Sequence, residues 1–290
     1  MDRMPSFAAP LDDGPTNTLN MFFKLPTPGL CAFIRVAIFT LKACEKFTLV
    51  DGRRIAFQSA RGGSNDIWVA QADGTGLMQI TRLGNSGSPR WSPDGKQFAF
   101  DSSRKNGMFE VWTVEAEGGS PRRLTNGVNG NSPSWSGNGK WLYFLSNRSG
   151  RMDIWRTPFE GGASEQITRK GGFVGLESND GKTLYYTKSN SGSEGIYAMP
   201  IRGGEENNII SDLVVRGSFA VVPEGIYYIT PRDENMCEIR LHEFALGRSR
   251  VVAEIERPIA FGLSVSPDQK TFLYSRPITG SDLMLIENFR

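Results

Sequence analysis

Histidine is almost missing from this sequence: the 290 residues contain one, His242. Hydrolases and metal enzymes commonly use histidine as a base or as a ligand, and a single copy supplies little of either. The motifs GxSxG, GxxxxGK[ST] and HExxH and the calcium-loop pattern are absent as well. We therefore predict no catalytic residue, no metal site and no cofactor, and we expect a protein that is not an enzyme.

Charge of one sign is also lacking, because 33 Lys and Arg face 31 Asp and Glu, for a net charge of +2. Such a balance gives no reason to expect nucleic acid as a partner. The three cysteines are widely spaced and form no CxxC pair, which argues against a disulfide framework and a zinc site. We expect Cys237 to be a packing residue.

Long hydrophobic runs are absent too. The apolar stretch 30–41, LCAFIRVAIFTL, is interrupted by Arg35 and is too short to span a bilayer. Residues 1–29 lack the basic start and early apolar core of a secretory signal, and we expect them to form a disordered leader. These features predict no membrane span, a cytoplasmic chain as given, and a periplasmic one if the native gene product is longer.

Glycine and aromatic residues are abundant, with 33 Gly, 18 Phe, 7 Tyr and 6 Trp, as in a fold of many short strands joined by tight turns. A two-residue turn recurs at spacings of 42 to 44 residues, beginning at positions 51, 94, 138, 180, 224 and 268. Most copies are Asp-Gly or Asn-Gly, which supply the positive φ angles of a hairpin. The chain therefore contains six copies of one unit.

Each unit has room for four strands. An alternating segment such as KQFAF (96–100) follows the turn, then a second such as EVWTVE (110–115), a short third ending in RLT (123–125), and a fourth such as SPSWS (132–136). This pattern is typical of a β-propeller blade. We predict an all-β fold over residues 30–290: a six-bladed propeller of four-stranded antiparallel blades.

The repeated side chains are expected to be structural. The central aromatic of each second strand should pack between blades; these are Trp68, Trp112, Trp155 and Tyr197. We also expect ion pairs across the second hairpin, namely Arg61 with Asp66, Arg104 with Glu110, and Arg148 with Asp153.

A ring must join its last blade to its first, because an open strand edge invites aggregation. The sixth unit stops after its third strand, whereas residues 33–40, FIRVAIFT, alternate well near the other end. We predict that 33–40 close the last blade beside 282–287 and that 46–50 begin the first. A vestigial membrane segment is the alternative interpretation of 30–41.

The segments SPRWSPDGKQFAF, SPSWSGNGKWLYFLSNRSG and DIWRTPFEGG resemble the WD-like repeats of TolB-type propellers over roughly residues 46–290. The run ITRKGGFVGLESNDGKTLYYTK and the terminus SPDQKTFLYSRPITGSDLMLIENFR are similar to the C-terminal repeat halves of large acidobacterial proteins. There, a winged-helix or Ser/Thr kinase domain precedes the repeats. The resemblance implies a sensor-like half of a larger regulatory or envelope system, without DNA binding by this chain.

Propellers usually bind ligands at the channel and its loops. The loops that precede the fourth strands vary among units and should meet at one channel mouth: 83–87, 126–131, 169–173, 212–218 and 255–261. From them and the adjoining strand we select Arg90, Asn129, Asn131, Phe173 and Arg216 as candidate ligand contacts. The predicted function is a monomeric, non-enzymatic module that binds a protein, a peptide or a small molecule. The alternatives are a hydrolase or lyase with its active site in the channel, or the detached propeller of a prolyl-oligopeptidase-type peptidase.

Overall fold

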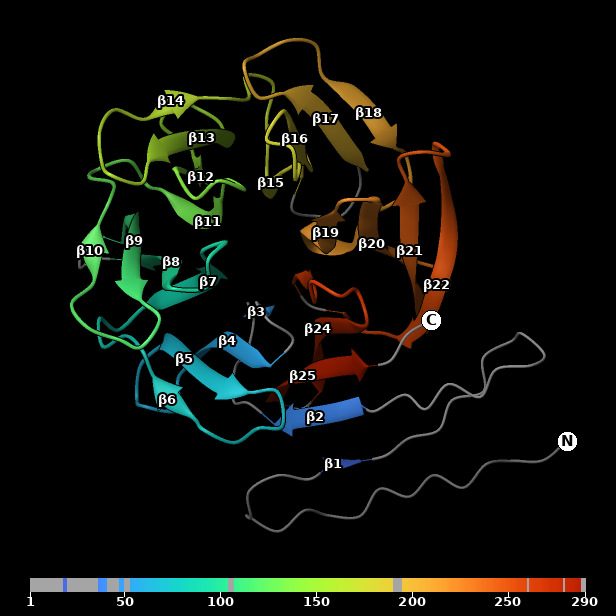
Figure 1. The fold of residues 1–290 in the computed structure, drawn as a ribbon, viewed down its shortest axis with the longest axis horizontal. Coiled ribbons are helices and arrows are strands. Elements are labelled where there is room, and N and C mark those ends of the chain that lie inside the picture. The colour runs from blue at the N-terminus through green and yellow to red at the C-terminus, as the bar shows by residue number, and fades with distance from the viewer. Residues whose placement is uncertain are drawn as a thin grey trace, which may run out of the picture.

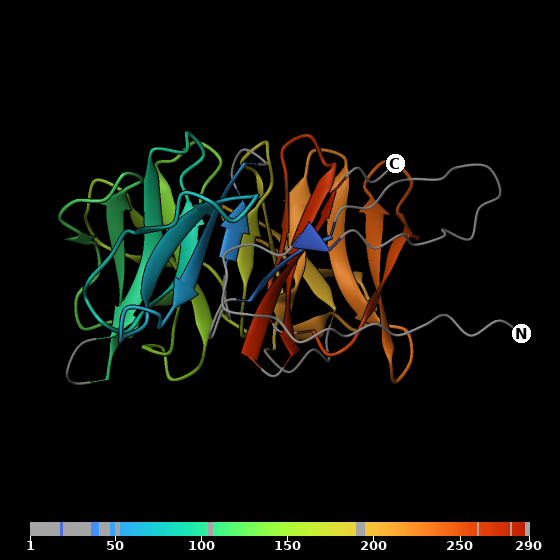
Figure 2. The same ribbon diagram turned by 90° about the horizontal axis from the view of Figure 1, so that it is seen from below.

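The computed structural model describes residues 18–19, 36–40, 47–49, 53–103, 107–189, 195–259, 261–278 and 280–287. Antiparallel sheets stand side by side around a central axis (Figure 1). From the side, their strands run between the two faces of a disc (Figure 2). The all-β propeller is therefore confirmed.

Five sheets are four-stranded blades that follow one another along the chain. The first contains β3 (Phe47–Leu49), β4 (Arg54–Ser59), β5 (Asp66–Gln71) and β6 (Met78–Gln79). The second contains β7 (Ser86–Trp91), β8 (Gln97–Ser103), β9 (Phe109–Glu115) and β10 (Arg122–Arg123). The third contains β11 (Asn131–Trp135), β12 (Trp141–Ser146), β13 (Asp153–Pro158) and β14 (Glu165–Gln166).

The fourth blade contains β15 (Gly175–Glu177), β16 (Thr183–Tyr186), β17 (Ile196–Pro200) and β18 (Asn207–Ile210). A short 3-10 helix, η1 (Val215–Gly217), leads into the fifth. The fifth contains β19 (Phe219–Val222), β20 (Gly225–Pro231), β21 (Met236–Glu243) and β22 (Arg248–Glu256).

The predicted count of six four-stranded blades is wrong. The structure has five such blades, and both ends of the chain contribute to a further sheet of five strands. Its order is β1 (Thr18–Leu19), β2 (Val36–Thr40), β25 (Gly280–Glu287), β24 (Thr271–Ile278) and β23 (Leu263–Val265). The turn count failed because it treated every Asp-Gly-like turn as the start of an identical unit. The turn at Asp268 instead belongs to a closing sheet that takes two strands from the N-terminal segment.

The strand that closes the ring was located correctly from its alternation. β2 pairs antiparallel with β25, from Val36 opposite Ile286 to Thr40 opposite Asp282. Residues 47–49 pair with β4, as predicted for the start of the first blade. Residues 18–19, which the prediction placed in the leader, pair with β2, and the rest of 1–29 lies outside the described residues.

The repeated turns are held by a local hydrogen-bond pattern. In the second blade, the Ser92 hydroxyl donates to the Asp94 carboxylate at 2.6 Å, and the backbone N–H of Lys96 donates to the same oxygen at 3.1 Å. Gly95 follows at a φ of 68°, a region that glycine enters without strain. The same pattern recurs at Ser136–Asn138, Ser178–Asp180 and Ser266–Asp268. The structural interpretation of these turns is confirmed.

The hydrophobic core lies between neighbouring blades rather than inside each one. One cluster joins Ile67 and Val69 of the first blade to Phe98 and Phe100 of the second, with Trp112 packed against it. Clusters of the same kind join the third blade to the fourth, and the fourth to the fifth. Trp68, Trp112 and Tyr197 therefore pack against clusters between blades, as predicted, whereas no such cluster of the described residues includes Trp155.

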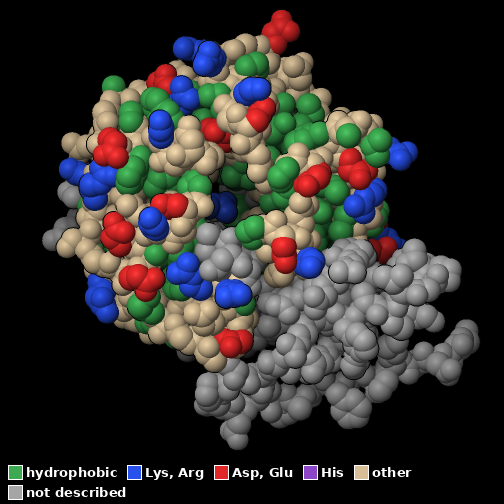
Figure 3. Space-filling view, in the orientation of Figure 1, with side chains coloured by type: hydrophobic (Ala, Val, Ile, Leu, Met, Phe, Trp, Pro, Cys, Tyr) green, Lys and Arg blue, Asp and Glu red, His purple; other side chains and the backbone are tan. Residues whose placement is uncertain are grey.

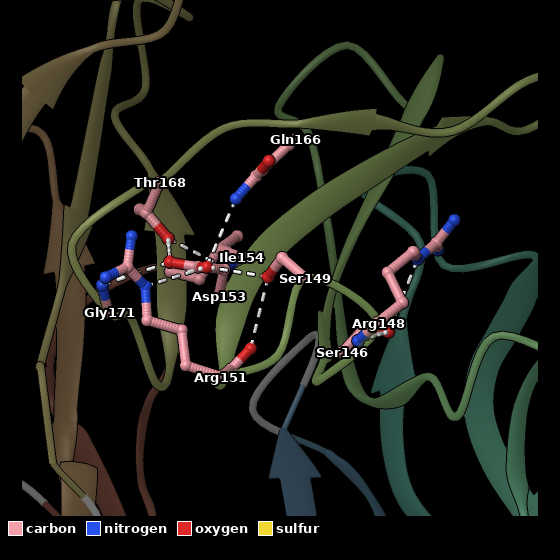
Figure 4. A network of polar contacts seen from close by, with 9 residues as sticks. All are labelled: Ser146, Arg148, Ser149, Arg151, Asp153, Ile154, Gln166, Thr168 and Gly171. Atoms are coloured by element: carbon pink, nitrogen blue, oxygen red, sulfur yellow. Dashed lines mark hydrogen bonds and ion pairs between the residues drawn. The ribbon is translucent and has the colours of Figure 1, made fainter.

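Each of the first three blades has a buried acid at the start of its second strand, and hydrogen bonds to this acid stabilise the blade. Asp153 accepts hydrogen bonds from the Thr168 hydroxyl at 3.2 Å, from the backbone N–H of Gly171 at 3.0 Å and from the Ser149 hydroxyl at 2.9 Å (Figure 4). Thr168 in turn accepts from the N–H of Ile154 at 2.8 Å. Asp66 with Thr81 and Glu110 with Thr125 repeat this arrangement.

The predicted ion pair of Arg148 with Asp153 is wrong. Asp153 pairs with Arg151 at 3.2 Å, whereas the Arg148 guanidinium lies 4.2 Å from the ring centroid of Trp155. Arg61 lies over Trp68 in the equivalent position, and Arg104 is outside the described residues. The arginines thus cover aromatic rings, which is a favourable cation–π arrangement.

The part of the chain that the structure describes contains no helix with the length and hydropathy of a membrane span.

Candidate functional site

A cavity of about 330 Å³ opens where the inner strands meet. We call it the channel pocket. It is lined by Ser88, Pro89, Arg90, Asp101, Phe109, Asn131, Ser132, Pro133, Ser134, Phe173, Val174, Gly175, Leu176, Gly217, Phe261 and Gly262. The face of the molecule in Figure 3 is hollowed at the centre of the ring, with hydrophobic side chains around the hollow. The volume is at the small end of the range for ligand pockets, which runs from about 300 to 1,000 Å³.

The structure brings three of the five predicted residues together. Arg90 of β7, Asn131 at the start of β11 and Phe173, just before β15, all line the channel pocket. Asn129 is not among the lining residues; its side chain donates to Asn147 Oδ1 at 3.1 Å and accepts from the N–H of Phe109 at 3.2 Å. The side chain of Arg216 lies outside the described residues, although its neighbour Gly217 lines the pocket.

Asp101 is a pocket residue that the sequence did not reveal. The residue is 3% exposed, and its Oδ2 accepts from the Ser88 hydroxyl at 2.5 Å and from the backbone N–H of Ser132 at 2.7 Å. Ser88 belongs to the same blade as Asp101 and Ser132 to the next one. The carboxylate therefore joins the second and third blades at the pocket wall.

Ser88 and Ser132 have unusual backbone conformations at equivalent places. Their φ angles are 51° and 50°, in the left-handed region, and the strand pairing shifts register beside each of them. Such residues cost of order 1–3 kcal/mol and are often found at binding sites. The signal available in the sequence was the Ser-Pro pair that occurs twice at one register, Ser88-Pro89 and Ser132-Pro133.

Arg90 is the single lysine or arginine among the described residues that line the pocket. Desolvation lowers the pKa of its guanidinium from the ordinary value, but a guanidinium remains protonated in proteins. Its backbone carbonyl accepts from the indole N–H of Trp135 at 3.1 Å, which ties β7 to the third blade. The pocket thus combines one positive charge, hydroxyl groups and an apolar wall.

A second cavity, of about 450 Å³, lies at the hairpin turns of the second and third blades. It is lined by the turn residues Ser92, Asp94 and Asn138 and by Trp135 and Phe159. The polar turn residues are already engaged in their own turns. We therefore regard this cavity as a consequence of the blade repeat and the channel pocket as the candidate site.

The residues considered for catalysis lie away from the channel pocket. His242 is on β21, is 9% exposed, and has its Nδ1 3.2 Å from the Ser249 hydroxyl. Cys237 is a free thiol inside a core cluster, as expected of a packing residue, and its burial raises the pKa of the thiol. Within the described residues, no three His, Cys, Asp or Glu side chains are grouped so that they could hold a metal ion.

Comparison with known families gives a match to the TolB beta propeller domain over residues 50–229, more than half of the chain. The chain belongs to the TolB β-propeller domain family. This membership confirms the TolB-like part of the resemblance noted from the repeats. None of the curated proteins compared with the chain matches it.

Solved structures share the fold of this TolB-type propeller at low sequence identity. TolB from Acinetobacter baumannii is 18% identical with a TM-score of 0.68, covering 84% of this chain and 66% of that one. The β-propeller domain of the Trilobed protease from Pyrococcus furiosus is 16% identical (TM-score 0.57; coverage 86% and 96%). Oligogalacturonate lyase from Vibrio parahaemolyticus is 10% identical (TM-score 0.60; coverage 94% and 97%). At these identities the likeness shows the fold alone.

Proposed function

We propose that the chain is a non-enzymatic binding module whose channel pocket holds a protein, peptide or small-molecule ligand. One observation carries the proposal: Arg90, Asn131 and Phe173 come from three successive blades and line one cavity. A ligand there would contact a cation, an amide and an aromatic ring at once. Few, well-placed polar groups in a mostly apolar pocket are typical of ligand sites.

The framework around the pocket supports this proposal. Buried acids and repeated turns fix the blades, so the pocket residues are presented by rigid elements. A rigid site loses less conformational freedom on binding than a mobile one. The strained Ser88 and Ser132 also lie in the pocket wall and not in the repeated turns.

The test of this proposal is affinity capture followed by mutation. A partner captured by the wild-type protein should no longer bind when Arg90, Asn129, Asn131, Phe173 and Arg216 are all replaced. Circular dichroism and the thermal midpoint of the variant would show that it still folds. A partner that binds the variant as tightly as the wild type would remove the channel pocket as the site.

A hydrolase or lyase that uses the channel as its active site is the second candidate, because similar folds occur in a lyase and in a protease. The detached propeller of a prolyl-oligopeptidase-type peptidase is a further form of it. Purified protein should be assayed against hydrolase and lyase substrates with and without divalent metals. We expect no turnover, and metal-dependent turnover would refute the non-enzymatic proposal.

We also propose that the module is the sensor-like half of a larger regulatory or envelope system. Its support is the sequence similarity to repeat halves that follow winged-helix or kinase domains. Mapping the 5′ end of the transcript tests this, since a continuous upstream frame for such a domain is the expected result. The monomeric state stays a prediction that sedimentation can test. The compartment, cytoplasmic or periplasmic, stays a prediction that cell fractionation can test.

A further inference from the structure

Arg90 is a charged side chain without a protein partner in the part of the chain that the structure describes. Its backbone carbonyl is engaged by Trp135, but its guanidinium has no hydrogen bond or ion pair there. Arg90 is of intermediate exposure and is one of the residues that line the channel pocket. Holding an unpaired cation in a partly buried position is costly, so proteins usually pair such a group or use it for binding.

Asp101, the acid in the pocket lining, does not serve as the partner of Arg90. Asp101 uses Oδ2 to accept from Ser88 and from Ser132, which are on two different blades. Of the lining residues that the structure describes, it is also the single Asp or Glu. Asp101 thus connects two blades, and the guanidinium N–H donors of Arg90 are available to a ligand.

The rest of the pocket wall indicates what that ligand looks like. Phe109, Phe173, Phe261, Val174 and Leu176 supply apolar surface, and Ser134 uses its hydroxyl to donate to the carbonyl of Gly175 at 2.6 Å. A ligand that matches this wall has an apolar body and one anionic end.

The charge count favours a carboxylate over a phosphate. One arginine matches one planar carboxylate, which can accept two parallel N–H bonds from the guanidinium. A phosphate carries up to two negative charges, and the described residues that line the pocket include no second Lys or Arg to compensate them. The second negative charge of a phosphate would instead be repelled by the carboxylate of Asp101.

We infer that the channel pocket binds a monocarboxylate with an apolar body, and that Arg90 holds the carboxylate. This inference rests on the proposed binding function and narrows it to a class of ligand. The small volume fits either a free apolar acid or the C-terminal residue of a peptide chain. Both present the same group, an apolar side chain next to a free carboxylate.

The test is a titration followed by NMR, with N-acetyl-L-phenylalanine and its C-terminal amide as probes. The two compounds have the same apolar body and differ in the charge that Arg90 would contact. We expect the acid to bind the wild-type protein about tenfold or more tightly than the amide. Signals of Phe109 and Phe173 should shift as it binds.

Variants assign the preference to Arg90. Arg90→Gln should weaken the acid about tenfold or more and leave the amide unchanged, so that the preference disappears. Arg202→Gln, at an exposed turn, is the matched control and should bind both compounds as the wild type does. The thermal midpoint of Arg90→Gln verifies that the loss is not unfolding.

Two further arms separate the sources of the carboxylate. N-acetyl-Ala-Ala-Phe binding more tightly than N-acetyl-phenylalanine supports a peptide end, and equal affinities support a small acid. The inference is overturned if acid and amide bind equally, if Arg90→Gln keeps the preference, or if the acid does not bind at about 10 mM. Equal binding with shifts at Phe173 would leave the proposed binding function standing. Loss of that function is detected separately, by the capture experiment.

Discussion

Asp101 Oδ2 accepts a hydrogen bond from the backbone N–H of Ser132 at 2.7 Å, across the boundary between the second and third blades. The two residues are 31 positions apart in the chain. The same oxygen accepts the Ser88 hydroxyl, so one buried carboxylate holds two strained loops in place at the channel pocket. Pocket shape and blade docking therefore depend on one side chain.

Asp101→Asn should lower the free energy of unfolding by about 1–3 kcal/mol. An amide oxygen accepts weaker hydrogen bonds from the Ser88 hydroxyl and the Ser132 N–H than the buried carboxylate does. Chemical denaturation measures the loss. Glu234→Gln, at an exposed position, is the control and should stay within about 0.5 kcal/mol of the wild type. Equal stabilities of Asp101→Asn and the control would show that the contact between blades contributes nothing.

The threonines that donate to the buried acids should contribute equally to the free energy of unfolding in three blades. Thr81→Val, Thr125→Val and Thr168→Val each remove one donor to a buried acid and one acceptor for a backbone N–H. We expect each to cost about 1–2 kcal/mol in the free energy of unfolding. Because the three sites are in different blades, the triple variant should lose the sum. A loss well below the sum would mean that the blades are not independent.

The repeated turns make a prediction about ionisation. The hydroxyl of Ser92, with help from the backbone N–H of Lys96, lowers the pKa of the Asp94 carboxyl below its ordinary value of 3.8. Asp180 and Asp268 behave alike beside Ser178 and Ser266. Ser92→Ala should raise the pKa of Asp94 in an NMR titration and leave that of Asp180 unchanged. An unshifted Asp94 in the variant would contradict the hydrogen-bond assignment.

His242 should make stability depend on pH. Desolvation lowers the pKa of its imidazole below the ordinary value of 6.5, so the unfolded chain binds a proton more readily than the folded one. The contribution of neutral His242 to the free energy of unfolding is therefore complete above the pKa of the unfolded chain, and it is lost as the pH falls below about 6.5. The free energy of unfolding should fall more between about pH 7 and pH 5 in the wild type than in His242→Gln. Parallel curves for the two proteins would contradict this.

Much of the fold could be predicted because its signals are local. A turn such as Ser92–Lys96 is specified by adjacent residues, and the strand at 36–40 alternates clearly. The blade count failed at the closing sheet, where two strands from the N-terminal segment, which the repeat does not include, join β23, β24 and β25. The pairing of Arg148 failed because the cation lies over Trp155, a contact that charge counting along the chain does not anticipate.

The channel pocket could be predicted only in part. Arg90, Asn131 and Phe173 were found because variable loops and the strands beside them converge at a channel mouth. Asn129 is not among the lining residues, and its side chain bonds to Phe109 and Asn147 instead. Asp101 was missed because it occupies an ordinary polar position of an alternating strand. Its role depends on Ser132 of the next blade, and such a contact is visible only in three dimensions.

The central claim is that ligands bind in the channel pocket, and one comparison of variants tests it most directly. The affinity of the captured partner should be measured for the wild type, for a triple replacement of Arg90, Asn131 and Phe173, and for a control triple replacement of Pro93, Gln97 and Phe159 in the other cavity. We predict that the channel variant loses binding and that the control variant keeps it. Loss of binding in the control variant alone would contradict the account.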